Sequence, residues 1–147
     1  MTILIKHQTG SGSVHDDALY IRKTVFVEEQ GVPLSEELDD LGNAMQFQYL
    51  VAYINNKPAT TARVIEEESG VWHIQRVATL PEMRHRSLGR QMMRYIEELS
   101  PTYHIHTLRL GAQLQAENFY RQLDFTPYGS SFLEAGIMHI NMKKELN

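Results

Sequence analysis

A strand, a basic turn, a helix and a second strand follow one another between residues 74 and 110, and this run constrains the fold more than any other part of the sequence. Residues 74–80 form an apolar run, and residues 84–90 read Arg-His-Arg-Ser-Leu-Gly-Arg. Apolar residues then recur at helical spacing until Pro101, namely Leu88, Met92, Ile96 and Leu99. Residues 105–110 alternate as a strand does. This order predicts a parallel strand pair joined by a crossover helix.

Shorter elements surround this crossover. Residues 2–6 predict a first strand, and residues 16–30 carry a helical pattern that Gly31 and Pro33 end. Residues 36–41 are a short acidic helix or a loop. Residues 47–54 and 59–67 predict two antiparallel strands around a turn, and residues 71–80 predict a third. A last helix and two strands ending at Met142 follow, the helix from the apolar stripe Ala112, Ala116, Phe119 and Leu123.

The predicted fold class is therefore α/β, of the α+β kind. We expect one domain over residues 1–147, because a chain of 147 residues accommodates one core of ordinary size. The order of elements predicts a mixed, mostly antiparallel sheet with a parallel crossover after the basic turn and helices on both faces.

Composition and charge argue against several classes of function. The net charge of −4 disfavours nucleic acid as a partner, because phosphate backbones bind basic faces. The sequence has no cysteine, so neither a thiolate nucleophile nor a cysteine zinc site is available. No apolar stretch has the length of a membrane span, and residues 1–10 lack the apolar core of a signal peptide. We expect a soluble, cytoplasmic protein that binds neither nucleic acid nor membranes.

The basic turn is suited to binding an anion. Backbone N–H groups at a helix N-terminus carry partial positive charge, and a small residue lets an anion approach the chain closely. Arg84, Arg86 and Arg90 add positive charge at the same place. The alternative is a basic loop that only starts a helix, and residues 84–90 by themselves favour neither interpretation.

Two motifs resemble those of a known family. The cofactor signature Arg/Gln-x-x-Gly-x-Gly/Ala, between a strand and a helix, aligns with Arg84, Ser87 and Gly89. A second signature, on a later helix, aligns with Gln113, Ala116, Phe119-Tyr120 and Asp124-Phe125. On these residues the sequence resembles the GNAT superfamily of acetyl-coenzyme A dependent N-acetyltransferases. Residues 22–31 and 132–140 are similar to its small bacterial ElaA-like subgroup.

Two residues depart from the family pattern, because Ser87 and Asp124 stand where glycines are usual. Serine is small and a good N-cap residue, but its Cβ crowds a bound diphosphate if the backbone there needs a positive φ. Asp124 is interpreted as a turn residue, because aspartate tolerates left-handed geometry better than most residues.

The resemblance implies a binding site for acetyl-coenzyme A. In the family, the strand before the turn pairs by its backbone with the pantetheine arm, the turn holds the diphosphate, and the second signature borders the far side of the arm. The matching positions are Val77, Ala78 and Thr79 in the strand, Arg84, His85, Arg86, Ser87, Leu88, Gly89 and Arg90 in the turn, and Gln113 and Phe119 beyond it.

Acetyl transfer to an amine needs a base and an acid, because the attacking amine is neutral and the departing thiolate takes up a proton. The resemblance implies Tyr120 as the acid, and an ordinary tyrosine, with a pKa of about 10, keeps its proton at neutral pH. Two histidines compete as the base: His139 in a late strand, and His73 on a predicted strand face with Gln75 and Val77. His139 ranks first because it belongs to the subgroup-like tail, and a water relay is the third alternative.

Other polar clusters have simpler interpretations. His104 and His106 share a strand face at a spacing that two metal ligands use, but no third ligand is indicated, so no metal is expected. The acidic residues are interpreted as a solvated surface, although they would also attract a cationic amine; they are Glu28, Glu29, Glu36, Glu37, Asp39 and Asp40.

The sequence thus predicts an acyltransferase that moves acetyl from acetyl-coenzyme A to a primary amine of a small molecule, by direct attack in a ternary complex. Two alternatives stay open. The pattern Arg22, Phe26 and Glu28 recurs loosely in acyl-homoserine-lactone-synthase-like acyltransferases, and the Ser87 departure suits a non-catalytic coenzyme A sensor. A homodimer through the last strands is common in the superfamily and is expected here.

Overall fold

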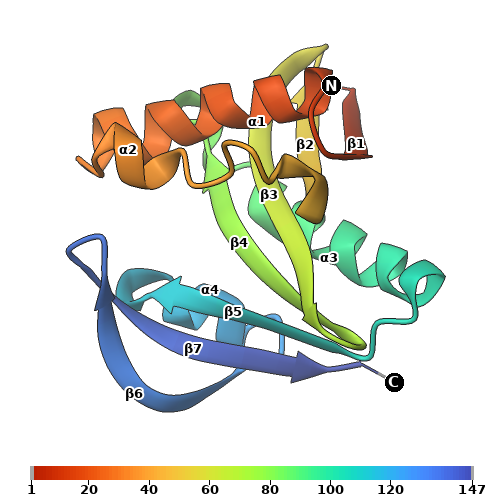
Figure 1. The fold of residues 1–147 in the computed structure, drawn as a ribbon, viewed down its shortest axis with the longest axis vertical. Helices are drawn as coiled ribbons and strands as arrows, with labels where there is room; N and C mark the ends of the chain where they lie inside the picture. Colours follow the sequence, from red (N-terminus) through yellow and green to blue (C-terminus); the bar gives the residue numbers. More distant parts are fainter. Residues whose placement is uncertain (1, 147) are drawn as a thin grey trace.

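The computed structural model describes residues 2–146, which form one sheet of seven strands in the order β1-β2-β3-β4-β5-β7-β6 (Figure 1). The strands are β1 (Ile3–Thr9), β2 (Gln48–Ile54), β3 (Lys57–Glu68), β4 (Val71–Thr79), β5 (Thr107–Gln113), β6 (Thr126–Glu134) and β7 (Ile137–Glu145). The α-helices are α1 (Ser13–Arg22), α2 (Leu34–Glu37), α3 (Leu88–Leu99) and α4 (Glu117–Arg121). A π-helical segment, Lys23–Glu29, continues α1, and short 3₁₀ turns lie at Ala44–Gln46, Pro81–Met83, Ser100–Tyr103 and Leu114–Ala116. Met1 and Asn147, the ends of the predicted domain, lie outside the described residues.

The predicted crossover is confirmed. β4 and β5 are parallel and are joined through α3, whereas the other neighbouring strands of the sheet pair antiparallel. β4 and β5 pair only over residues 71–74 and 107–110. Beyond those residues the two strands diverge, so that the sheet opens on the side away from the β3–β4 turn (Figure 1).

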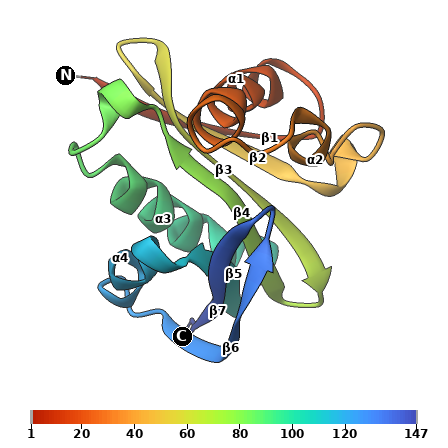
Figure 2. The same cartoon turned by 90° about the vertical axis from the view of Figure 1, so that its left-hand side faces the viewer.

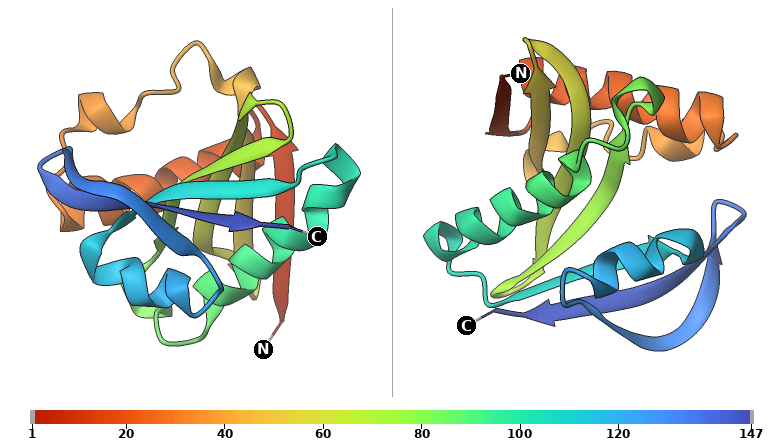
Figure 3. Two further views of the ribbon diagram at one scale, coloured as in Figure 1. Left: turned by 90° about the horizontal axis from the view of Figure 1, so that it is seen from below. Right: turned by 180° about the vertical axis from the view of Figure 1, so that it is seen from behind.

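Helices cover both faces of the sheet, as predicted, and the alternation of β2 explains why. Leu50 and Ala52 pack into one core cluster with Met92 and Ile96 of α3, whereas Tyr49, Val51 and Tyr53 pack into another with residues of α1. Figure 2 shows α1 and α2 on one side of the strands and α3 and α4 on the other. A view from behind shows α3 running across β2, β3 and β4 (Figure 3). Among the described residues, no helix is long and apolar enough to cross a lipid bilayer.

Two predicted helices differ from the observed ones. The helix expected over residues 16–30 begins at Ser13 and becomes π-helical from Lys23 onward, where the N–H of Gln30 donates to the carbonyl of Val25 over 3.0 Å. The helix expected over residues 112–123 is wrong at its start, because Ala112 lies in β5 and pairs with Ile140 of β7. The helical spacing of that stripe is real, but long-range strand pairing overrides it.

Six charged side chains form a cluster between α1, α2, β3 and β4, which we call the arginine–carboxylate cluster: Arg22, Arg63, Arg76, Glu37, Asp39 and Asp40. Arg22 contacts Glu37 and Asp40 over 2.8 Å each. Arg63 lies 2.7 Å from Asp39, and Arg76 lies 2.8 Å from Glu37 and 3.2 Å from Asp39. Three guanidinium groups therefore face three carboxylates, and the formal charge of the cluster is zero.

The expectation of a solvated acidic surface is wrong for two of these residues. Glu37 and Asp40 are 2% and 1% exposed, because arginines distant in the sequence replace water around them. Burial raises the pKa of Asp40, but hydrogen bonds from Arg22, Tyr49 and His15 outweigh burial and hold that pKa well below its usual range.

Candidate active site

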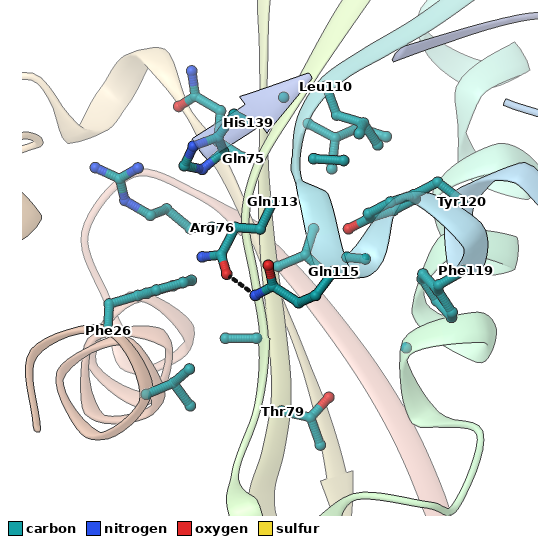
Figure 4. Close-up of a pocket in the computed structure, with 18 of the residues that line it drawn as sticks. Phe26, Gln75, Arg76, Thr79, Leu110, Gln113, Gln115, Phe119, Tyr120 and His139 are labelled. Atoms are coloured by element: carbon teal, nitrogen blue, oxygen red, sulfur yellow. Dashed lines mark hydrogen bonds between the residues drawn. The ribbon is translucent and has the colours of Figure 1, made fainter. Parts of the chain in front are cut away.

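A cavity of about 1160 Å³ occupies the space where β4 and β5 diverge. Its walls come from β4, β5 and β7, the N-terminus of α3, α4 and the π-helical segment, which contributes Phe26 (Figure 4). Of the predicted site residues, the cavity brings together all but Arg86, which does not line it. The basic turn therefore turns Arg84 and Arg90 toward the cavity and leaves Arg86 outside.

The facing edges of β4 and β5 carry backbone groups without a strand partner. Among the described residues, β4 beyond Ile74 pairs only with β3, and β5 beyond Leu110 pairs only with β7. Polar backbone groups that find no partner in the protein need one from water or a ligand. These edges are therefore suited to hydrogen-bond the amide groups of an extended ligand.

A bulge in β4 changes which side chains face the cavity. Arg76 has φ +57°, and the register with β3 shifts beside it. Before the bulge, Ile74 packs on the α3 side of the sheet, and after it Val77 packs on that same side. The predicted common face of His73, Gln75 and Val77 is therefore wrong, because strand alternation is interrupted at Arg76.

The basic turn has the backbone geometry of an anion site. His85 and Ser87 have φ +66° and +59°, and the first helical hydrogen bond of α3 runs from Gln91 N–H to the Ser87 carbonyl over 3.0 Å. The N–H groups of the first turn of α3 therefore lack helical acceptors. Ser87 makes no side-chain cap hydrogen bond, so its predicted advantage as an N-cap is absent. Gly89 packs against the ring of Phe119, where a Cβ would lie 3.2 Å from that ring.

Arg84 is held at the cavity edge by an acidic partner. Its guanidinium donates two hydrogen bonds to Glu29, of 2.6 and 2.7 Å, and a third to the Thr79 carbonyl over 3.2 Å. The hydrogen bonds from Arg84 lower the pKa of the Glu29 carboxyl. Glu29 therefore binds Arg84 here and not a substrate cation.

Tyr120 reaches the cavity from α4. Its side chain is 7% exposed and packs edge-on against Phe119 and Phe125, with ring centroids 4.9 and 5.8 Å apart. Figure 4 shows its hydroxyl directed toward the middle of the cavity. Among the described residues this hydroxyl has no hydrogen-bond partner, and burial raises the pKa of Tyr120 above its ordinary value. The phenol therefore stays protonated at neutral pH.

Both candidate bases line the cavity, but their environments differ. His139 is 8% exposed, its Nδ1 lies 2.7 Å from the Ile137 carbonyl, and its Nε2 is 3.7 Å from a Glu134 oxygen. A carbonyl only accepts, so Nδ1 carries the proton and Nε2 of the neutral ring keeps its lone pair. His73 is bound through Nδ1 to Glu67 over 2.6 Å and contacts Gln75 over 3.2 Å. Both contacts of His73 are made at its Nδ1, so among the described residues the Nε2 of each histidine is without a hydrogen bond. Burial distinguishes the two, because the side chain of His139 is 10% exposed and that of His73 is 28% exposed.

A second cavity of about 220 Å³ adjoins the first. The two share six lining residues, which are Phe26, Gln30, Arg76, Gln113, Glu134 and His139. Gln30 and Gln113 bridge the walls by a reciprocal amide pair, with hydrogen bonds of 3.3 and 2.9 Å. Figure 4 shows a further hydrogen bond between Gln113 and Gln115. Gln113 lies at the end of β5 and not on the predicted helix.

Sequence reasoning missed part of this site. Phe26 and Gln30 reach it only because the π-helical segment follows α1, and Arg76 only because β4 bulges. Glu134 was part of the subgroup-like tail but received no role of its own. The signal available in the sequence was the position of Glu134, an acidic residue in the same tail as the candidate base His139.

The predicted strand face shared by His104 and His106 is wrong, because both residues precede β5. His104 lies in a left-handed turn with φ +59°, and His106 hydrogen-bonds Thr107 over 2.8 Å. In residues 2–146, no three histidine, aspartate or glutamate side chains gather in a way that would hold a metal ion.

Comparison with known proteins identifies the domain and agrees with the fold. The profile of the acetyltransferase (GNAT) domain matches residues 19–146. The chain is 33% identical to the uncharacterized N-acetyltransferase YjcF of Bacillus subtilis, over 88% of this chain and 91% of YjcF. It is 29% identical to the protein ElaA of Escherichia coli, over 87% of this chain and 85% of ElaA.

Solved structures give the same result. A crystal structure of a Lactobacillus plantarum protein superposes with a TM-score of 0.91 and 26% identity, over 100% of both chains. The crystal structure of Escherichia coli ElaA superposes with a TM-score of 0.78 and 26% identity, over 97% of this chain and 100% of that one. With the domain profile covering most of the chain, and β4 and β5 diverging around the cavity, the chain belongs to the GNAT acetyltransferase family.

Proposed function

We propose that this protein transfers the acetyl group of acetyl-coenzyme A to the primary amine of a small molecule, by direct attack in a ternary complex. One observation carries the proposal: a single cavity joins an anion-suited turn and two unpaired strand edges to Tyr120 and His139. Family membership supports the reaction class.

The residues present fit acetyl-coenzyme A, which supplies an acetyl group activated as a thioester. The N–H groups at the start of α3, together with Arg84 and Arg90, suit its diphosphate. The free edge of β4 at residues 77–79 suits the amides of its pantetheine arm. Gln113 and Phe119 border the same cavity on its opposite wall.

The proton transfers follow from the two side chains. The amine attacks as the neutral species, so an ammonium group first gives up one proton to water; as its nitrogen bonds to the acetyl carbon it loses a second proton, which His139 Nε2 accepts. The carbon–sulfur bond breaks, and Tyr120 Oη supplies the proton that the departing sulfur takes up. His73 is the second candidate for the base, because it lines only the larger cavity, whereas His139 lines both.

The acyl-homoserine-lactone-synthase alternative loses its support. Of the three residues that carried it, Arg22 is buried in the arginine–carboxylate cluster and Glu28 does not line the cavity, which leaves only Phe26. The coenzyme A sensor differs from the proposal only in turnover.

The test is calorimetric titration with acetyl-coenzyme A, followed by a thiol-release assay with primary amines. Arg84→Ala is expected to weaken binding about tenfold, because it removes a charge-assisted contact to phosphate. Arg121→Ala, an exposed arginine on α4 outside the cavity, is the matched control and should bind like the wild type. No binding at millimolar cofactor refutes the proposal, and binding without thiol release from any amine identifies a sensor.

A further inference from the structure

We propose that the acetyl acceptor is a short aliphatic diamine, with one ammonium group at Glu134 and the other at Glu36 in the smaller cavity. This inference rests on the proposed function, since it names the substrate of that same site. Three observations carry it: the position of the smaller cavity, the balance of charge in its walls, and its size together with the apolar side chains among its lining residues.

The position of the smaller cavity fits an acceptor. It shares His139 and Glu134 with the larger cavity, so a molecule in it lies next to the proposed base. His139 is more than nine-tenths buried, yet its Nε2 has no hydrogen-bond partner among the described residues and lies 3.7 Å from Glu134. A molecule in the smaller cavity can therefore hydrogen-bond this nitrogen directly.

The charges in the walls favour a cation. Arg76 and Glu37 line the smaller cavity, but both belong to the arginine–carboxylate cluster, whose three positive and three negative charges cancel. Two further carboxylates line the cavity, Glu36 and Glu134. Neither has an arginine or lysine partner within residues 2–146, where the contact of Glu134 with His139 is its one ion pair. The cavity wall thus carries two negative charges that a substrate can neutralise.

The two carboxylates come from different elements, Glu36 from α2 and Glu134 from the end of β6. The same cavity is also lined by three apolar side chains, Phe26, Val32 and Ile137. Methylene groups pack against such a surface, and ammonium groups at the two ends reach the carboxylates. The volume of about 220 Å³ equals about seven liquid-water volumes, which suits a chain of a few carbons.

The same arrangement disfavours amino acids. A carboxylate at the far end of the acceptor faces Glu36, and like charges repel. Both arginines near the wall, Arg22 and Arg76, already hold carboxylates of the cluster. The cavity therefore selects at the far end of the acceptor and not only at the reacting amine.

Three acceptors of equal chain length test this selection: 1,4-diaminobutane, butylamine and 4-aminobutyrate, which end in an ammonium, a methyl and a carboxylate group. With wild-type enzyme we expect kcat/KM to fall in that order, by about fivefold at each step, the size of a partly screened ion pair. Glu36→Gln should bring the ratio of diamine to butylamine to about one and should lessen the handicap of 4-aminobutyrate. Glu68→Gln, an exposed glutamate outside both cavities, should keep the wild-type order.

Calorimetry with acetyl-coenzyme A on every variant separates the two proposals. If the cofactor binds, equal kcat/KM for the three acceptors, a preference for 4-aminobutyrate, or no acetylation of any of them overturns the diamine inference alone. If the wild-type protein does not bind acetyl-coenzyme A, the proposed function fails first. An unchanged diamine preference in a folded Glu36→Gln variant that binds cofactor also overturns the inference.

Discussion

The arginine–carboxylate cluster and the cavity between β4 and β5 use similar polar groups in opposite ways. In the cluster, each guanidinium lies within 2.8 Å of a carboxylate, and the charges cancel. In the cavity, the Tyr120 hydroxyl, His139 Nε2 and two strand edges lack hydrogen-bond partners in the described part of the chain. Arg76 belongs to both regions. The comparison teaches that a cluster of neutralised charges fixes the wall against which the unpaired groups can meet a ligand.

The largest effect should come from breaking the cluster. Asp40→Ala leaves Arg22 buried without one of its partners, and we expect the free energy of unfolding to fall by about 3–5 kcal/mol, as for a broken buried ion pair. Chemical denaturation at pH 7 measures this. Glu98→Ala, an exposed glutamate on α3, is the control and should cost less than about 0.5 kcal/mol.

The stability difference between the wild type and Asp40→Ala should also depend on pH. The pKa of Asp40 is lowered in the folded state, so its contribution is present above the unfolded pKa of about 3.9 and is lost as the pH falls below that value. The stability difference between wild type and Asp40→Ala should therefore narrow in acid. A difference that stays constant from pH 7 to pH 3 contradicts the ionised role of Asp40.

The next-largest effect should come from removing the Tyr120 hydroxyl, the proposed acid in the cavity. Tyr120→Phe removes only a hydroxyl that has no partner among the described residues, so stability and acetyl-coenzyme A affinity should change little, while kcat falls about 100-fold. Steady-state kinetics and calorimetry give the two values. Tyr20→Phe, an exposed tyrosine on α1, serves as the control. Equal kcat in Tyr120→Phe and wild type rules out the acid role.

A smaller effect distinguishes the two histidines. His139→Ala should lower kcat about tenfold and abolish the rise of rate with pH on the acid side of the profile, since water substitutes poorly for the base. His73→Ala should keep that rise, because it leaves His139 in place as the base. The reverse pattern would assign the base to His73, and loss of the rise in neither variant would favour a water relay.

The smallest effect should come from the ion pair between Arg84 and Glu29 at the edge of the cavity. Glu29→Gln removes the charge that holds Arg84, and we expect acetyl-coenzyme A to bind about threefold more tightly, because both side chains are partly exposed and their pairing is screened. Calorimetry measures the affinity, with the neighbouring Glu28→Gln as the control. Weaker binding in Glu29→Gln would mean that Glu29 orients Arg84 for the ligand.

The sequence was most informative where structure is local. The crossover, the basic turn and the helix after it follow from periodicity and punctuation within residues 74–110, and the structure has them there. The alternation of β7, with His139 toward the cavity and Met142 in the core, is likewise a local pattern.

The sequence did not predict features that depend on residues far apart in the chain. Glu37 and Asp40 read as a solvated acidic run, and only the folded chain brings Arg22 and Arg63 to them. The bulge at Arg76 leaves no composition signal, since arginine is not a residue that favours φ +57°. Tyr120 was recognisable through the family motif alone, because nothing in its neighbours' periodicity distinguishes it from a core tyrosine.

The π-helical segment after α1 has a consequence for how such a site can change. An α-helix turns by about 100° per residue, so one residue more or fewer in a helix rotates everything after it by about that angle. The π-helical hydrogen bonds determine the direction in which Phe26 and Gln30 leave the helix axis, and both side chains line the cavities. Deleting one residue from Lys23–Glu29 would turn this wall away while β4 and the basic turn stay in place. A change of one codon in length is therefore enough to refit the proposed acceptor side of the cavity independently of the proposed cofactor side.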